Sequence, residues 1–166
     1  DPILYSVDKT DGSLTAIGDT EVEHVMDLAF DPQGTLWAVG GGQGGGNRLY
    51  TIDPTTGAST FVTDLSDASG EIDVAPGGAE IMGIMFDEHG ALFGTAFLPG
   101  PDPNDYMSPL FSIDSTTGLA TVIGQTGFRL PHGGDYLIPE PGTIGMILIG
   151  STLIPFVRRR CSLPTC

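Results

Sequence analysis

The sequence predicts an all-β repeat domain followed by one membrane-spanning helix. The chain of 166 residues contains 25 Gly and 13 Pro, and Asp-Gly, Pro-Gly and Thr-Gly steps recur along it. Such steps mark tight turns between short strands. No stretch before residue 142 has a sustained apolar pattern at helical spacing. Residues 142–157 are uncharged and are followed directly by three arginines, so we expect a helix only at this end.

Three segments of the sequence align with one another as β-hairpins. Each alternates apolar and polar residues, breaks at a Thr-Gly or Asp-Gly turn and resumes the alternation, which is typical of a hairpin with one buried face. These segments, here called the LY hairpins, are residues 4–18, 49–62 and 110–124. A second kind of hairpin follows the first two of them, at residues 26–39 and 82–94, with Asp opening the turn and Gly closing it.

One repeat unit is therefore about four strands, an LY hairpin and the hairpin after it. Equivalent aspartates are 45 residues apart from Asp8 to Asp53 and 61 residues apart from Asp53 to Asp114. This period lies in the range of propeller blades. The segments LYTIDPTTG and MDLAFDPQGTLW also resemble the repeats of β-propeller proteins.

The number of repeats is too small for a closed ring. We count two complete units and a third that ends near Gly124, with residues 133–137 as a candidate remnant of its second hairpin. Closed propellers have about 4–8 blades, so about two and a half blade-like units form an open or collapsed structure with sheet edges to cover. The alternatives are an open series, collapsed packing of two sheets, an oligomer that completes the ring, and a docked partner. All of them favour an interaction role.

The charge of the chain is strongly negative and unevenly placed. Residues 1–138 carry 3 basic and 20 acidic side chains, a formal charge of −17. Such a body repels phosphate backbones and anionic lipid surfaces, which excludes nucleic-acid binding. The acidic surface is either a solvated exterior of turn aspartates or a field that attracts cations or a basic protein partner.

Residues 142–157, GTIGMILIGSTLIPFV, are predicted to form a single transmembrane helix. Sixteen residues rise about 24 Å as a helix, less than the hydrocarbon core of roughly 30 Å, so bilayer thinning or snorkelling arginines must cover the difference. A buried core helix is disfavoured because three guanidinium groups would follow it into the interior. The predicted membrane stop is Arg158, Arg159 and Arg160, which the positive-inside tendency places in the cytoplasm, with residues 1–138 outside.

The residues around this segment resemble a bacterial sorting signal. Pro139, Glu140 and Pro141, then the apolar run and the basic cluster, resemble in that order the PEP-CTERM signal of Gram-negative bacteria. The resemblance covers residues 138–160 and implies recognition by an exosortase, a membrane transpeptidase or protease that processes proteins bound for the cell surface. The chain departs from the family by continuing to Cys161 and Cys166, which are either acylated near the membrane or free cytoplasmic thiols.

These features divide the chain into four parts. We predict an extracytoplasmic β-repeat domain (1–138), a Pro-Glu-Pro linker (139–141), a transmembrane helix with its basic stop (142–160) and a short cytoplasmic tail (161–166). The chain opens at Asp1 without Met, which suits removal of a secretory signal peptide.

No catalytic constellation is recognisable in the sequence. His24, His89 and His132 are widely separated, serine occurs in no G-x-S-x-G elbow, and the body contains no cysteine. The glycine-rich run 40–46 lacks the Gly-Lys-Ser/Thr of a phosphate-binding loop and is interpreted as a loop between repeats.

The sequence predicts no cofactor, and calcium is the one alternative that its acidic loops offer. It takes about six to eight oxygen ligands, which acidic loops outside the cell can supply. No loop matches the EF-hand spacing, and Asp is also an ordinary turn former. The candidate ligands are Asp64, Asp67, Glu71 and Asp73.

The sequence thus predicts a non-enzymatic, membrane-anchored interaction or scaffold domain on the outer face of a bacterial cytoplasmic membrane. Its expected partners are the subunits of a larger, energy-converting complex (photosynthetic or respiratory) and the lipid bilayer, through residues 142–157. The alternative, which the resemblance implies, is an exosortase-processed protein of the cell surface, extracellular matrix or biofilm. The two hypotheses differ in whether residues 140–166 are kept.

Overall fold

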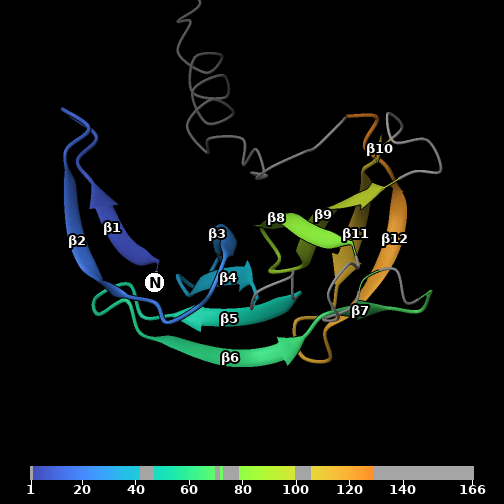
Figure 1. The fold of residues 1–166 in the computed structure, drawn as a ribbon, viewed down its shortest axis with the longest axis horizontal. Helices are drawn as coiled ribbons and strands as arrows, with labels where there is room; N and C mark the ends of the chain where they lie inside the picture. Colours follow the sequence, from blue (N-terminus) through green and yellow to red (C-terminus); the bar gives the residue numbers. More distant parts are fainter. Residues whose placement is uncertain (1, 42–46, 70–71, 73–78, 100–105, 129–166) are drawn as a thin grey trace, which may run out of the picture. The chain divides into compact units, whose positions relative to one another are not determined.

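A computed structural model describes residues 2–41, 47–69, 72, 79–99 and 106–128, all within the first of two units, Asp1–Tyr136 and Leu137–Cys166. This part of the chain consists of twelve strands joined by turns and loops, without a helix, so the prediction of an all-β body is confirmed (Figure 1). The predicted linker, transmembrane helix and cytoplasmic tail (139–166) lie outside the described residues. Within the described residues, no helix is long and apolar enough to cross a membrane.

The strands form three sheets that follow one another along the chain. The first sheet is a hairpin of β1 (Ile3–Val7) and β2 (Leu14–Asp19). The second is an antiparallel meander of β3 (Val25–Phe30), β4 (Leu36–Gly40), β5 (Arg48–Ile52) and β6 (Ser59–Asp64). The third repeats this order with β8 (Glu80–Phe86), β9 (Leu92–Pro99), β11 (Pro109–Ile113) and β12 (Leu119–Gln125).

Two short strands extend the third sheet. β7 (Ser66–Asp67) pairs in parallel with β12, and β10 (Tyr106–Met107) pairs with the end of β9. The sheets are partly curled, like half a barrel, and β2, β6 and β12 lie on its outer side (Figure 1).

The four-stranded unit begins at a different point from the predicted one. The sequence pattern grouped each LY hairpin with the hairpin after it, whereas in the structure the hairpin 26–39 joins the LY hairpin that follows, through β4 and β5. The reason lies in the connection after β2. Glu21 and His24 there have φ angles of 55° and 51°, which turn the chain away from β2 so that β3 starts a new sheet.

The three LY hairpins are built alike. Each has its register shift at the same point, after the first leucine of the strand. Each turn opens with an aspartate, Asp8, Asp53 or Asp114, whose carboxylate accepts the backbone N–H two residues on at 2.8 Å. Each turn closes with a glycine of positive φ, which a residue with a side chain rarely adopts.

This common register defines equivalent positions in the three hairpins. The equivalent sets are Tyr5, Tyr50 and Phe111; Val7, Ile52 and Ile113; Gly12, Gly57 and Gly118; Ile17, Val62 and Ile123; and Gly18, Thr63 and Gly124.

Both faces of the second sheet are apolar. Side chains alternate between the faces of a strand. Leu36 and Ala38 on β4 belong to a core shared with Leu4 of the first sheet. Val39 and Trp37 lie in the core shared with the third sheet, where the Trp37 ring is 5.6 Å from that of Phe86. The second sheet is therefore stabilised by a neighbour on each side.

Polar bridges fix the third sheet against the second. The buried Asn47 side chain accepts the backbone N–H of Ile81 at 2.7 Å and donates to the carbonyl oxygen of Ala79 at 2.5 Å. The Asp27 carboxylate accepts the N–H of Ile84 at 2.8 Å. Because buried backbone groups need partners, these bonds position β8 beside the second sheet.

Replacing Asn47 with Ala should lower the free energy of unfolding by about 1–3 kcal/mol, because two buried backbone groups lose their partner. Denaturant unfolding followed by the fluorescence of Trp37, the only tryptophan of the chain, measures this. Gln33→Ala removes an exposed amide side chain and should change the stability little. Equal effects of the two substitutions would contradict a bridging role for Asn47.

Candidate functional site at the open ends of the sheets

The turn of an LY hairpin is seated on the preceding sheet at two junctions. At the first, a Cβ atom on Gly18 would lie 1.9 Å from the carbonyl oxygen of Thr56, so a side chain at Gly18 would displace the turn. At the second, a Cβ atom on Gly118 would lie 1.9 Å from the carbonyl oxygen of Asp64. At both junctions the backbone of the turn thus lies directly against the backbone of the preceding outer strand; the glycine that permits this contact is in the strand at the first junction and in the turn at the second.

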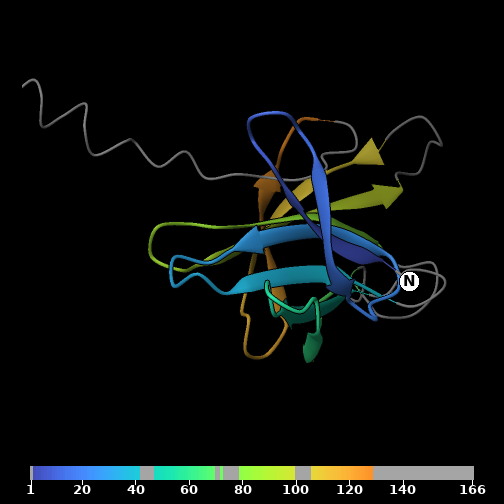
Figure 2. The same ribbon diagram turned by 90° about the vertical axis from the view of Figure 1, so that its left-hand side faces the viewer.

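The first turn has no such seat among the described residues. An added Cβ atom on Gly12 would have no neighbour within 4 Å, whereas the equivalent Gly57 and Gly118 are buried. Val7 is 60% exposed, whereas its equivalents Ile52 and Ile113 are 3% and 5% exposed. We call Tyr5, Val7 and the turn 8–13 the head surface. In Figure 2 the first hairpin faces the viewer, and no described strand lies in front of it.

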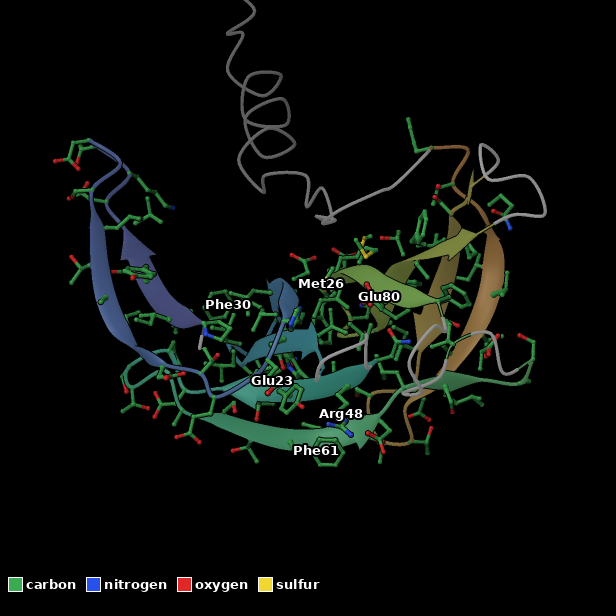
Figure 3. All side chains as sticks on the ribbon, viewed as in Figure 1. Glu23, Met26, Phe30, Arg48, Phe61 and Glu80 are labelled. Carbon is green, nitrogen blue, oxygen red and sulfur yellow. The ribbon has the colours of Figure 1, made fainter. Side chains whose placement is uncertain are left out.

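An apolar groove adjoins the head surface, between the first hairpin and the second sheet. Its volume is about 390 Å³. Phe30, labelled in Figure 3, is 59% exposed beside it, whereas Phe86 occupies the same place in the third sheet and is 9% exposed. Among the described residues, β1 pairs with β2 alone. The groove is lined by Leu4, Tyr5, Ser6, Ile17, Leu28, Phe30, Leu36 and Pro54.

The third sheet presents the complementary half of a junction. An added Cβ atom on Gly124, the equivalent of Gly18, would have no neighbour within 4 Å. Ile123 is 54% exposed, whereas its equivalents Ile17 and Val62 are half-buried against the following sheet. We call Leu110, Ile123, Gly124 and Gln125 the tail surface.

A buried hydroxyl beside the tail surface also lacks a partner. Ser108 directly precedes β11, at the position that Asn47 holds before β5. The Ser108 Oγ atom is buried and has no hydrogen-bond partner among the described residues, whereas Asn47 bonds to the next sheet. The tail end thus lacks both a hydrogen-bond partner for Ser108 and apolar side chains packed on Ile123, among the described residues.

The predicted calcium ligands are in part engaged with other groups. The Asp64 carboxylate accepts a hydrogen bond from Nε of Arg48 at 3.2 Å, and Arg48 is labelled in Figure 3. The Asp67 carboxylate accepts the N–H of Ile72 at 3.0 Å and the hydroxyl of Ser69. No group of three or more His, Cys, Asp or Glu suited to a metal occurs in the described ranges. Glu71 and Asp73 lie outside them, so calcium stays the alternative hypothesis.

The other residues that the sequence singled out lie apart from one another or outside the described ranges. His24 lies in the connection from β2 to β3. His89 lies in the turn before β9, with its Nε2 atom 3.6 Å from the Glu88 carboxylate. Outside the described residues are His132, the sorting motif Pro139, Glu140 and Pro141, and the membrane stop Arg158, Arg159 and Arg160.

The turn carboxylates are held in their charged form by local hydrogen bonds. Burial raises the pKa of Asp31, but bonds from Trp37 Nε1 at 2.9 Å and from the N–H groups of Thr35 and Gln33 outweigh it, so the pKa is lowered. The pKa values of the LY-hairpin aspartates are lowered as well, by hydrogen bonds from the threonines that follow them. These residues are Asp8, Asp53 and Asp114.

No protein-family model matches this chain, and no curated protein matches it. No site can therefore be transferred from a relative. The open ends were expected from the repeat count, but the head and tail residues were not. The available signal was a glycine inside an otherwise apolar strand, Gly18 and Gly124, at matching places of two aligned segments.

Valine at Gly18 and valine at Gly124 should have opposite consequences for stability. Gly18→Val places a side chain against the turn seated there, and should lower the free energy of unfolding by about 1–3 kcal/mol because the site is overpacked. Gly124→Val meets open space and adds a residue that favours strands, so the stability should stay the same or rise. Denaturant unfolding by Trp37 fluorescence compares the two. A destabilised Gly124→Val variant would contradict the open seat.

Acid should remove the contribution of Asp31 to stability. Because its pKa is lower in the folded than in the unfolded chain, this contribution is complete above the ordinary value of 3.8 and is lost as the pH falls through the folded value. The difference in unfolding free energy between the wild type and Asp31→Asn should therefore shrink below about pH 4. Acid also reduces the repulsion among the other acidic residues, but it does so in both proteins, so this effect drops out of the difference. A difference that does not change with pH would contradict this prediction.

Proposed function

We propose that residues 1–138 form a non-catalytic interaction domain, with its sheets as the blades of an incomplete propeller. The observation that carries the proposal is the pair of uncovered, complementary ends, the head and tail surfaces. Within the chain, two junctions between successive sheets are each formed by a head-like surface packed on a tail-like surface. The exposed head and tail surfaces are the two halves of a further junction of this kind.

The propeller assignment is supported by the repetition of the sheets. The second and third sheets have the same strand order, and their inner strands share the register shifts at Val25–Asp27 and Ile81–Gly83. Successive sheets pack face to face through two apolar clusters. Face-to-face succession of four-stranded meanders is the arrangement of propeller blades.

The exposed apolar side chains at the ends favour binding over catalysis. Apolar surface in water costs about 25 cal/mol per Å², and contiguous patches of it mark interaction sites. At the head end these side chains include Ile3, Tyr5, Val7 and Leu14, and at the tail end Ile123 and Phe128.

The location of the domain is proposed from the C-terminal sequence. A transmembrane helix at 142–160 with its arginine stop would hold residues 1–138 outside the cytoplasmic membrane, as a structural subunit of a larger bacterial membrane complex. A formal charge of −17 on those residues suits a basic partner surface.

A second candidate function is supported by the order of the three parts of the C-terminal segment. The Pro-Glu-Pro motif, the apolar run and the arginines together resemble the exosortase signal. The domain would then be released to the cell surface or the extracellular matrix and would act there as an adhesive or structural unit.

The intact mass of the protein extracted from its native membranes in mild detergent tests both candidates. A mass that includes Cys166, with companions in fixed stoichiometry, is expected for an anchored subunit. A mass that ends near residues 139–142 would identify the processed surface protein and exclude the anchored subunit. Full-length protein without any bound copy or companion would overturn the interaction function itself.

A further inference from the structure

We propose that the partner at the open ends is a second copy of this chain. The head surface of each copy docks on the tail surface of the other, and two copies close a ring of six sheets, three from each. This inference rests on the proposed interaction function, because it names the partner of the same surfaces.

The head surface has the residues of a docking face that the chain already uses. At the internal junctions, Ile52 and Ile113 are 3% and 5% exposed, and Phe111 is 1% exposed. Their equivalents in the first hairpin are Val7, at 60%, and Tyr5, at 45%. Where a preceding sheet is present, the side chains equivalent to Val7 are buried, and those equivalent to Tyr5 are half-buried (Tyr50) or buried (Phe111).

The tail surface has the shape that receives this face. Gly18 accepts the backbone of Thr56 at the first junction, and the Thr63–Asp64 step accepts Gly118 at the second. The equivalent step is Gly124–Gln125, which lies after the half-exposed Ile123 and has an open seat. The turn 53–58 occupies the corresponding position beside Gly18. The turn 8–13 has the same structure as that turn and contacts no preceding strand among the described residues, so it can occupy the open position beside Gly124.

Two copies satisfy both ends at once. A head-to-tail contact uses two different surfaces, so it forms a closed ring when the rotation closes and a fibre when it does not. Each copy contributes two sheets built on a four-stranded meander and the two-stranded hairpin β1–β2. The ring then has six sheets, two of them half-blades, within the range of about 4–8 blades of closed propellers. The two contacts are identical, and no head or tail surface stays exposed.

The salt dependence of the complex distinguishes a second copy of this chain from a basic protein as the partner. Two bodies of formal charge −17 repel each other, and salt screens the repulsion, so the dimer should strengthen as the salt concentration rises. A complex with a basic partner should weaken under the same change. The contact surfaces themselves are apolar side chains and backbone, which salt does not screen.

Native mass spectrometry of the full chain in mild detergent tests the proposal. The wild type is expected to be a dimer, and Ile123→Asp is expected to weaken it about 100-fold or more, because it places a charge at both contacts where the equivalent Ile17 and Val62 pack against the following sheet. Thr121→Asp, which adds the same charge, is the matched control on β12. Thr121 and its equivalents Thr15 and Thr60 are all exposed, so this position is covered at neither junction, and the control should stay dimeric.

The direction of the contact is tested by disulfide cross-linking. With Cys161 and Cys166 replaced by Ser, Asp11→Cys and Gln125→Cys place one thiol on the head turn and one beside the seat. A mixture of the two single variants should form mixed cross-linked dimers, and neither variant alone should do so. Self-cross-linking of Asp11→Cys alone would show head-to-head contact and overturn the proposal.

Other outcomes separate this inference from the proposed function. A monomer, or a dimer that Ile123→Asp leaves intact, would overturn the two-copy ring, as would assemblies larger than two copies. If the monomer from native membranes carries a different protein that Ile123→Asp releases, the interaction function stands and only the choice of partner fails. A protein that is monomeric in every variant and carries no other protein in native membranes would overturn both proposals.

Discussion

Each complete sheet of this domain is apolar on both faces, and the rest of the structure depends on that constraint. A strand such as β4 sends Leu36 and Ala38 to one side and Trp37 and Val39 to the other. With such a pattern a sheet cannot leave one face in water, as ordinary antiparallel sheets do. Each sheet needs a neighbour on either side, and only a ring or a capped series provides that throughout.

The way in which neighbours meet follows from the turns. The aspartate that opens each LY turn uses its carboxylate on its own backbone N–H groups, and the glycine that closes it supplies a left-handed residue without a side chain. The result is a flat turn that approaches the backbone of the preceding strand, at Gly18 and at Asp64. Since the same element provides the turn and the seat, each hairpin carries both halves of a junction, as in repeat proteins generally.

Much of this could be read from the sequence, because local chemistry determines it. Alternation and the Asp and Gly of the turns identified all three LY hairpins, and a residue count indicated that the ends are open. The grouping of hairpins was wrong because it depends on the connection after β2. There Glu21 and His24, neither of them typical of the left-handed region, adopt positive φ. The two-residue strands β7 and β10 form only because neighbouring strands are already in place.

The seat glycines show most clearly why the site could not be predicted. Within a strand, glycine indicates a bulge, a bend or a close approach of another backbone, and sequence alone does not distinguish these. Gly18 and Gly94 both stand in strands, but an added Cβ atom would meet a neighbouring turn at Gly18 and the side chain of Ile113 at Gly94. Only the register of the sheets shows that Gly124 repeats Gly18 without the turn. The open end is thus identified by comparing equivalent positions within the molecule. Gly18 contacts the turn of the next hairpin, whereas Gly124 has no such turn beside it among the described residues.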